Sequence, residues 1–356
     1  NYFAIHIISY LLNIYLLLYY VLMNKVYKIN NTLRHDWSSD EAKSIIDQPL
    51  LDLVYQAQTI HRSNFPKNEI QKSKLLSIKT GSCPEDCSYC SQSAHHNVDL
   101  KKEPLISLNE VIKAAEAAVE EGATRFCMGA AWRGPTDNNI DQVCNMVEAV
   151  NNLGLESCVT LGMLKDGQAK KLADSGLNYY NHNIDTSKEF YNSIIRTRKF
   201  SDRLDTLEKV RNAGVKVCSG GIIGMGESRT DRAEMLRTLS NLEEHPESVP
   251  INMLIRIPGT PLGNVEPLDH IELVRTIALA RIMMPMSTVR LSAGRAEMSN
   301  STQALCFLAG ASSIFLGDVL LTADNPGTDK DNNMLDNFGL KGETKISFKD
   351  EIKIVS

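Results

Sequence analysis

Short apolar runs alternate with helix-periodic segments from about residue 75 onward. Runs of four to eight residues rich in apolar and β-branched side chains are typical of buried strands. The runs that we predict to be strands are 75–80, 125–129, 156–160, 177–183, 215–223, 251–255, 287–292 and 312–316. Strands that alternate with helices indicate a parallel sheet, and eight of them suffice to close a barrel. We therefore predict an α/β fold, a (β/α)8 barrel of the TIM type.

The segments between these runs carry helix signals. Helices are predicted near 111–121, 139–153, 167–175, 202–213, 230–242, 268–283 and 300–310, and residues 36–70 predict N-terminal helices packed outside the barrel. Ser107 and Glu110 have the spacing of a capping box before the first of them. Glycines stand where helix C-caps are expected, at 122, 154, 176 and 214.

The chain divides by composition into three parts. We predict an N-terminal extension over 1–35, a barrel with flanking helices over 36–325 and an irregular polar tail over 326–356. Residues 2–23 are apolar enough to span a bilayer, and basic residues follow them, so an anchor would leave the remainder in the cytoplasm. Because the chain starts with Asn and Met23 precedes ordinary polar sequence, we prefer the interpretation that 1–22 are upstream sequence and the product is cytoplasmic.

Composition narrows the classes of function. The chain has 356 residues, a formal net charge of -5 and no basic stripe, which argues against a nucleic-acid partner. It has eight cysteines and no evident secretory signal. A chain this long does not need disulfides to stabilise its core, and reduced cysteines in a cytosolic protein point to metal binding or catalysis.

The strongest local motif follows the first predicted strand. Cys83, Cys87 and Cys90 have the spacing C-x3-C-x2-C, and Tyr89 precedes the last of them. Three thiolates can hold a [4Fe–4S] cluster by three corners, which leaves the fourth iron open to a small molecule. This spacing is that of the radical S-adenosylmethionine enzymes. The alternative is a zinc site completed by His95 or His96.

Three further cysteines lie on separate predicted strands. Cys127, Cys158 and Cys218 fall on the second, third and fifth strands, inside or near their ends, where barrel enzymes place their active sites. We interpret them as a second set of metal ligands, against the alternative that each is a small core residue. Cys144 and Cys306 fall in helical patterns and are interpreted as core. The seventh strand carries Arg290, which spacing alone would not propose as a ligand.

At this point the sequence resembles the biotin synthase family over about residues 36 to 340. The matching stretches are LLSIKTGSCPEDCSYC, TRFCMGAAWR, YYNHNIDTS, RLDTLEKVRNAGVKVCSGGIIGMGE, ESVPINMLIRIPGTPL and ARIMMPMSTVRLSAGR. The resemblance implies a (β/α)8 barrel with two iron–sulfur clusters, usually as a homodimer. It also implies the insertion of sulfur between two unactivated carbons of dethiobiotin, driven by 5′-deoxyadenosyl radicals.

The resemblance assigns roles to particular residues. It implies that Cys83, Cys87 and Cys90 hold the [4Fe–4S] cluster, and that Cys127, Cys158, Cys218 and Arg290 hold a [2Fe–2S] cluster that donates the sulfur. Asn181, Asn183 and Asn252 are implied to face the substrate. The residues implied to bind S-adenosylmethionine are Tyr89, Asp185, Gly220, Gly221, Ile222, Gly224 and Glu227. No side chain is expected to act as an acid or base, because the cofactors supply the chemistry.

The resemblance further implies a small electron-transfer protein as reductant and a dependence on iron–sulfur assembly machinery. Three features depart from the family pattern: the apolar N-terminus, Ser228 where Thr is common, and Ala323 in place of the second residue of a Thr-Thr pair associated with the substrate carboxylate. Three other functions remain as alternatives. They are another radical enzyme of the same barrel group, such as an iminoacetate or methylornithine synthase, a zinc or redox binding protein, and a decayed copy.

Overall fold

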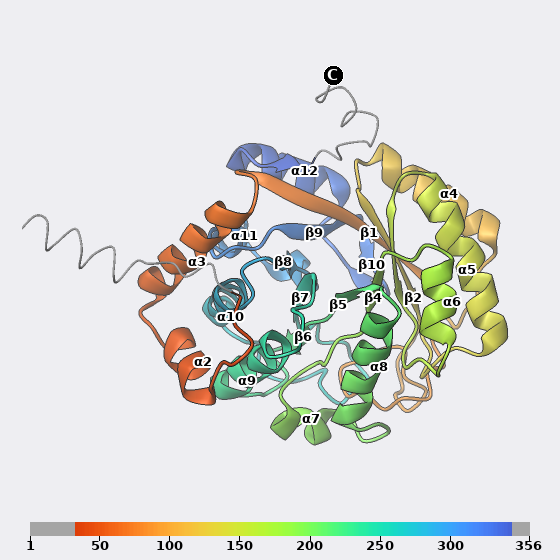
Figure 1. Cartoon of the computed structure of the whole chain (residues 1–356), viewed down its shortest axis with the longest axis horizontal. Coiled ribbons are helices and arrows are strands. Elements are labelled where there is room, and N and C mark those ends of the chain that lie inside the picture. Colours follow the sequence, from red (N-terminus) through yellow and green to blue (C-terminus); the bar gives the residue numbers. More distant parts are fainter. Residues whose placement is uncertain (1–32, 344–356) are drawn as a thin grey trace, which may run out of the picture. The chain divides into compact units, whose positions relative to one another are not determined.

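The strands form a closed parallel barrel in the computed structural model, which describes residues 33–343 (Figure 1). Hydrogen bonding runs from β1 through β9, and β9 pairs with β1 to close the ring. The strands are β1 (Glu69–Lys79), β2 (Arg125–Ala130), β3 (Glu156–Thr160), β4 (Tyr179–Asn181), β5 (Lys216–Cys218), β6 (Gly221–Ile223), β7 (Ser248–Met253), β8 (Thr288–Leu291) and β9 (Ser313–Leu316). The predicted barrel is confirmed.

The fifth predicted strand is broken in two. Cys218 on β5 pairs with Ser248, whereas β6 pairs further along β7, from Gly221 opposite Ile251. The break lies at Ser219–Gly220, where the chain runs against β7. A Cβ atom on Gly220 would lie 1.9 Å from the carbonyl oxygen of Pro250. Glycine is therefore required for this close approach of two backbones.

Helices surround the barrel, mostly where their periodicity predicted them. They are α2 (Ser39–Ile46), α3 (Leu50–Asn64), α4 (Leu108–Glu120), α5 (Asp137–Asn152), α6 (Gln168–Asp174), α7 (Lys188–Ile194), α8 (Phe200–Asn212), α9 (Arg229–Ser240), α10 (His270–Met283) and α11 (Asn300–Leu308), with a 3₁₀ turn at Arg295–Glu297. The capping box of Ser107 and Glu110 begins α4, as predicted. The short α7 was not predicted; Ser187 caps it by accepting from the backbone N–H of Phe190.

The segment after residue 325 is not irregular, so that prediction was wrong for its first part. Thr328–Phe338 forms α12, and Lys341–Gly342 forms β12, a parallel partner of β1. The helix buries Met334 and Leu335, and Asp331 forms a buried ion pair with Arg295. Polar composition concealed this segment because only a narrow stripe of α12 faces the protein.

A short antiparallel hairpin follows the last barrel strand and was also missed. It consists of β10 (Val319–Leu320) and β11 (Ala323–Asp324). Leu321, in the turn between them, has a φ of 57°, a left-handed conformation that is uncommon for a leucine. Next to it, the hydroxyl of Thr322 lies 2.8 Å from that of Ser91. The hairpin is therefore joined to the cysteine loop that follows β1.

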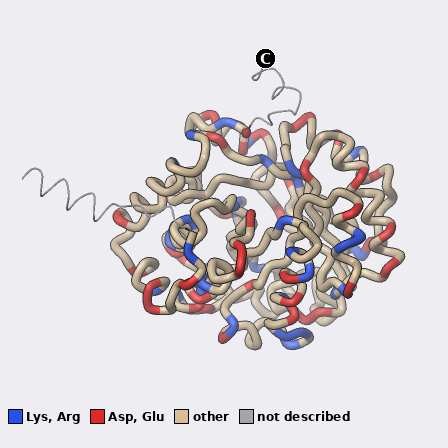
Figure 2. Tube along the Cα trace, viewed as in Figure 1, with Lys and Arg blue, Asp and Glu red and all other residues tan. Residues whose placement is uncertain are grey.

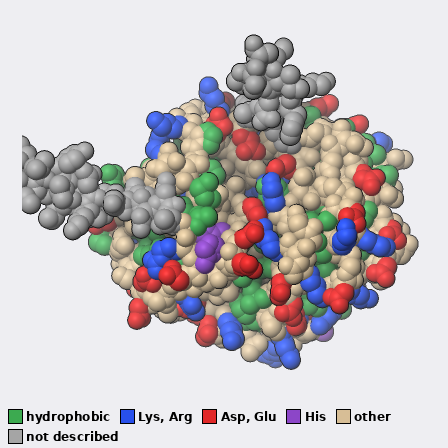
Figure 3. Space-filling model, in the orientation of Figure 1, with side chains coloured by type: hydrophobic (Ala, Val, Ile, Leu, Met, Phe, Trp, Pro, Cys, Tyr) green, Lys and Arg blue, Asp and Glu red, His purple; other side chains and the backbone are tan. Residues whose placement is uncertain are grey.

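Charged residues of both signs are interspersed along the described trace and over the face shown in space-filling form (Figures 2 and 3). No helix within residues 33–343 has the length and apolar character needed to cross a bilayer. The predicted apolar segment 2–23 lies outside the described residues, as do residues 344–356 of the predicted tail.

Candidate active site

The loop after β1 carries Cys83, Cys87 and Cys90 as free thiols. Backbone hydrogen bonds fold it back on itself: Cys83 N–H donates to Gln92 O at 2.9 Å, and Ala94 N–H donates to Cys83 O at 2.7 Å. The loop therefore presents all three thiols from one short, tightly turned segment at the carboxyl end of β1.

Burial sets the chemistry of these three thiols. It raises the pKa of Cys83 and Cys87 above the ordinary value, and it raises that of Cys90 to about 12. Neighbouring thiolates oppose one another's ionisation, so three thiolates on this loop require a multiply charged cationic partner. A cluster bound at three separate corners fits this donor set.

The zinc alternative finds no support in the histidines beside the loop. The Nε2 atom of His95 lies 3.0 Å from Pro84 O, and that of His96 lies 2.9 Å from Cys87 O. Both imidazoles instead contact the backbone of the cysteine loop.

Cys127, Cys158 and Cys218 meet inside the barrel. Cys127 on β2 is directly opposite Cys158 on β3, while Cys218 on β5 is opposite Asn181 on β4. All three side chains are buried in one cluster. The interaction with the neighbouring thiol of Cys158, aided by the charge of Arg290, lowers the pKa of Cys218 below its ordinary value.

Arg290 closes this group from β8. Its side chain is 1% exposed, Nε donates to Ser313 Oγ at 2.9 Å, and Nη2 donates to Ser73 Oγ at 3.0 Å and to Gln71 Oε1 at 3.1 Å. Among the described residues no carboxylate pairs with it. A buried guanidinium without a carboxylate is costly unless other anions compensate it, and the thiolates in the same pocket fit that need.

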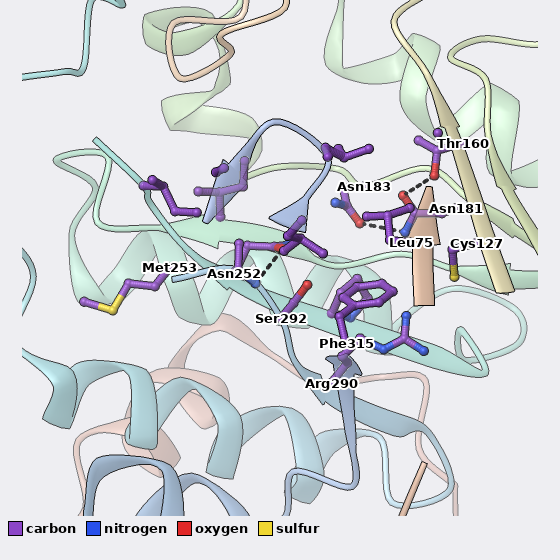
Figure 4. A pocket seen from close by; sticks show the side chains of 18 of the residues that line it. Leu75, Cys127, Thr160, Asn181, Asn183, Asn252, Met253, Arg290, Ser292 and Phe315 are labelled. Carbon is purple, nitrogen blue, oxygen red and sulfur yellow. Dashed lines mark hydrogen bonds between the residues drawn. The ribbon is translucent and has the colours of Figure 1, made fainter. Parts of the chain in front are cut away.

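A cavity of about 260 Å³ is lined by the barrel cysteines and by Tyr89 of the cysteine loop. Cys127, Cys158, Cys218 and Arg290 line its inner part, and Tyr89, between the loop thiols Cys87 and Cys90, lines it as well. Figure 4 shows Asn181 and Asn183 on one side of this pocket and Asn252 with Ser292 on another. Apolar residues complete the wall, among them Met253, Leu254, Ile255, Leu320 and Leu321.

The three asparagines are held in place by the barrel. Asn181 Nδ2 lies 3.2 Å from Cys218 Sγ, and its Oδ1 accepts from Thr160 Oγ1 at 3.2 Å. Asn183 Oδ1 accepts from the backbone N–H of Gly220 at 3.1 Å. Asn252 donates to Gly221 O at 3.0 Å. The oxygen and nitrogen of a primary amide can each make more than one hydrogen bond. These side chains are therefore fixed in position and can still form hydrogen bonds with a ligand in the pocket.

Asp185, in the segment that follows β4, lines the pocket together with Tyr89. Its φ is 69°, and its backbone carbonyl accepts from Ile222 N–H at 2.8 Å. The hydroxyl of Tyr89 donates to Asp185 Oδ2 at 2.9 Å, and the buried Arg203 donates to the same oxygen. Both donors engage Oδ2, which leaves Oδ1 available to a ligand. Arg203 was not among the predicted site residues, because on α8 its periodic position resembles that of an ordinary helix arginine.

The predicted glycine-rich stretch divides into two roles. Ile222 lines the cavity, whereas Gly220, Gly221, Gly224 and Glu227 are not among the lining residues. Glu227 is buried and turns back on its own loop, accepting from the N–H groups of Gly224 and Met225 and pairing with Arg232 at 2.8 Å. These residues therefore shape the wall that presents Ile222.

Comparison with known proteins agrees with this geometry. The Radical SAM superfamily model matches residues 77–239, and the Biotin and Thiamin Synthesis associated domain matches 250–341. A biotin synthase of Rhodopseudomonas palustris is 60% identical over 310 residues, covering 87% of this chain and 92% of the relative. The chain belongs to the biotin synthase family. A second member, from Alkalilimnicola ehrlichii, is 60% identical over 309 residues, covering 87% of this chain and 93% of its own.

Solved structures share the fold at low sequence identity. Methylornithine synthase superposes with a TM-score of 0.76 at 17% identity, covering 90% of this chain and 97% of its own. The FeFe-hydrogenase maturase HydG from Carboxydothermus hydrogenoformans also has a TM-score of 0.76, at 18% identity, covering 96% of this chain and 85% of its own. This likeness shows a shared barrel fold and nothing about the substrate.

Proposed function

We propose that this chain converts dethiobiotin to biotin within the cavity described above, using both sets of thiols. In this proposal Cys83, Cys87 and Cys90 hold a [4Fe–4S] cluster. Cys127, Cys158, Cys218 and Arg290 hold a [2Fe–2S] cluster on the inner side of the cavity. The single observation that carries the proposal is that the three barrel cysteines and Arg290 line one pocket together with Tyr89, which stands between the loop thiols Cys87 and Cys90 in the chain. Three amides line the same pocket.

When bound, the four-iron cluster supplies the electron that cleaves S-adenosylmethionine to a 5′-deoxyadenosyl radical, and the two-iron cluster supplies the sulfur. The protein's own part is to position the substrate and S-adenosylmethionine and to exclude water from the cavity. Asn181, Asn183 and Asn252 offer donors and acceptors that match a planar ureido ring. Oδ1 of Asp185 can accept from a ribose hydroxyl, since carboxylates commonly bind ribose diols.

The apolar part of the cavity suits an aliphatic chain and keeps water from a reactive carbon. Leu320 and Leu321 of the hairpin line this part, together with Met253, Leu254 and Ile255. Arg290 stays charged inside the barrel and offsets the thiolates beside it. We extend the proposal to a homodimer that receives electrons from a small carrier protein and has its clusters rebuilt by assembly machinery.

An anaerobic single-turnover assay tests the function. Protein reconstituted with iron and sulfide is mixed with dethiobiotin, S-adenosylmethionine and a strong reductant, and mass spectrometry measures biotin and 5′-deoxyadenosine. We expect both products, together with loss of the [2Fe–2S] absorbance. Formation of 5′-deoxyadenosine without biotin would refute the substrate, and absence of both from fully loaded protein would refute the activity.

A further inference from the structure

Arg198 lies against the cysteine loop and belongs to none of the predicted site groups. It is in the segment between α7 and α8, and its side chain is 8% exposed. Its Nη2 atom donates to Cys87 Sγ at 3.4 Å. Its Nε atom is buried and makes no hydrogen bond in the described part of the chain. One face of this guanidinium is thus directed at a thiol of the loop.

Hydrogen bonds on either side of Arg198 fix this arrangement. Asp86, inside the cysteine loop, accepts from the backbone N–H groups of Arg196 and Thr197 at 3.0 and 3.1 Å through Oδ1. The hydroxyl of Thr197 donates to Glu85, also in the loop. The segment that carries Arg198 is therefore attached to the two residues that precede Cys87. This attachment places the backbone of Arg198 beside the cysteine loop, within reach of the contact between Nη2 and Sγ.

The charge of Arg198 is only partly neutralised. The nearest carboxylate, Glu85, is 2% exposed and lies 3.7 Å away, whereas Arg133 lies 2.8 Å from the same carboxylate. Arg203, the next buried cation, is paired with Asp185. Arg198 consequently brings net positive charge to Cys87 in an environment where charges act strongly.

We propose that Arg198 is a positioning residue that raises the reduction potential of the four-iron cluster, an inference that rests on the proposed assignment of Cys83, Cys87 and Cys90. Reduction adds one negative charge to a cluster and its thiolates. A donor on a ligand sulfur and a nearby cation stabilise the reduced form more than the oxidised form. Removing the donor or the charge therefore lowers the potential.

Redox titration of the reconstituted protein tests this, with the reduced cluster followed by electron paramagnetic resonance in the absence of S-adenosylmethionine. For Arg198→Gln we expect the reduction equilibrium to become about tenfold less favourable, which is about 59 mV for one electron. Arg133→Gln is the matched control, because it removes the other cation on Glu85 but contacts no thiol. The reduction equilibrium of the Arg133 variant should change by less than about threefold, since the charge that it removes lies on a more exposed side chain.

Arg198→Lys separates charge from hydrogen-bond geometry and should give an intermediate shift. Equal potentials for the wild type and a fully loaded Gln variant would overturn the proposal. If the Gln variant takes up no iron, the Lys variant decides: a lowered potential supports the proposal, and an unchanged potential or failure of both variants to bind a cluster overturns it. If the wild type itself forms no four-iron cluster, the proposed function fails and this inference fails with it.

Discussion

Tyr89 donates a hydrogen bond of 2.9 Å to Oδ2 of Asp185, which joins the cysteine loop to the end of β4. The two residues are 96 positions apart in the chain, and they line the same cavity. Burial raises the pKa of Tyr89 well above the ordinary value, so its hydroxyl stays protonated and remains a donor. The carboxylate is thereby held in one orientation before any ligand binds.

Tyr89→Phe should weaken S-adenosylmethionine binding. A hydrogen bond to a carboxylate contributes about 1.5 kcal/mol or more, so we expect a dissociation constant about tenfold higher. Equilibrium dialysis of the anaerobic, cluster-loaded protein measures it. Tyr180→Phe is the control, because it removes a buried hydroxyl that contacts Gly162 O outside the site. Equal affinities in all three proteins would show that the Tyr89–Asp185 contact does not organise the binding site.

Substitution of a cysteine should affect different products depending on which of the two groups it belongs to. Cys218→Ala should still cleave S-adenosylmethionine but form no biotin, because in the proposed assignment it removes a ligand of the inner cluster alone. Cys87→Ala should lose both products. Cys306→Ala is a suitable control, since this thiol is buried in α11 outside the cavity. Mass spectrometry of the single-turnover products checks all three, and full biotin yield from the Cys218 variant would contradict the sulfur-donor role.

The hairpin should determine how the end of the substrate is bound. Ala323 lines the cavity, and the hydroxyl of Thr322 already contacts Ser91. Ala323→Thr adds a hydroxyl at this position, and we expect it to improve dethiobiotin binding about threefold to tenfold, the value of one hydrogen bond. The affinity for dethiobiotin amide should change less. Val319→Thr, at an exposed position of the same hairpin, is the control. An equal gain for acid and amide would argue against a contact with the carboxylate.

Gly220→Ala should destabilise the barrel severely. The new Cβ would lie 1.9 Å from Pro250 O, so β7 must move away from the break between β5 and β6. We expect a loss of about 3 kcal/mol in the free energy of unfolding. Gly214→Ala provides the comparison: its φ is 78° with open space around it, so only about 1 kcal/mol of backbone strain is expected. Thermal denaturation measures both variants, and equal losses of stability in the two would contradict this prediction.

Sequence predicted those parts of the site that depend on regular spacing. Three thiols on one loop, and three more on separate strands, follow from position alone once the barrel is recognised. The proposed ligand role of Arg290 required the family resemblance, because it depends on burial beside thiols. Arg198 and Arg203 could not be found in this way, since their contacts join residues about 20 to more than 100 positions apart. Such contacts are fixed by tertiary packing, to which hydrophobic periodicity is insensitive.

The insensitivity of periodicity to tertiary contacts also explains the errors in the predicted fold. The break between β5 and β6 reflects the close approach of Gly220 to β7, which a continuous apolar run conceals. The hairpin at Val319–Asp324 depends on Leu321 in a left-handed conformation, where glycine or asparagine is the usual signal. The helix at 328–338 has mostly polar positions, and its anchor is the ion pair of Asp331 with Arg295. In each case a contact outside the segment determines the local structure.

The hydrogen bond between Ser91 and Thr322 links the cysteine loop to the hairpin, so we expect damage to the cluster to affect the hairpin too. Ser91 follows Cys90 directly, so under the proposed assignment we expect loss of iron from this loop to loosen the attachment of the hairpin as well. Oxidative damage would then remove the four-iron cluster and, at the same time, expose the backbone of the hairpin. We expect air-exposed protein to become sensitive to proteases near 319–324 first, so that inactivated molecules are marked for degradation while intact ones are spared.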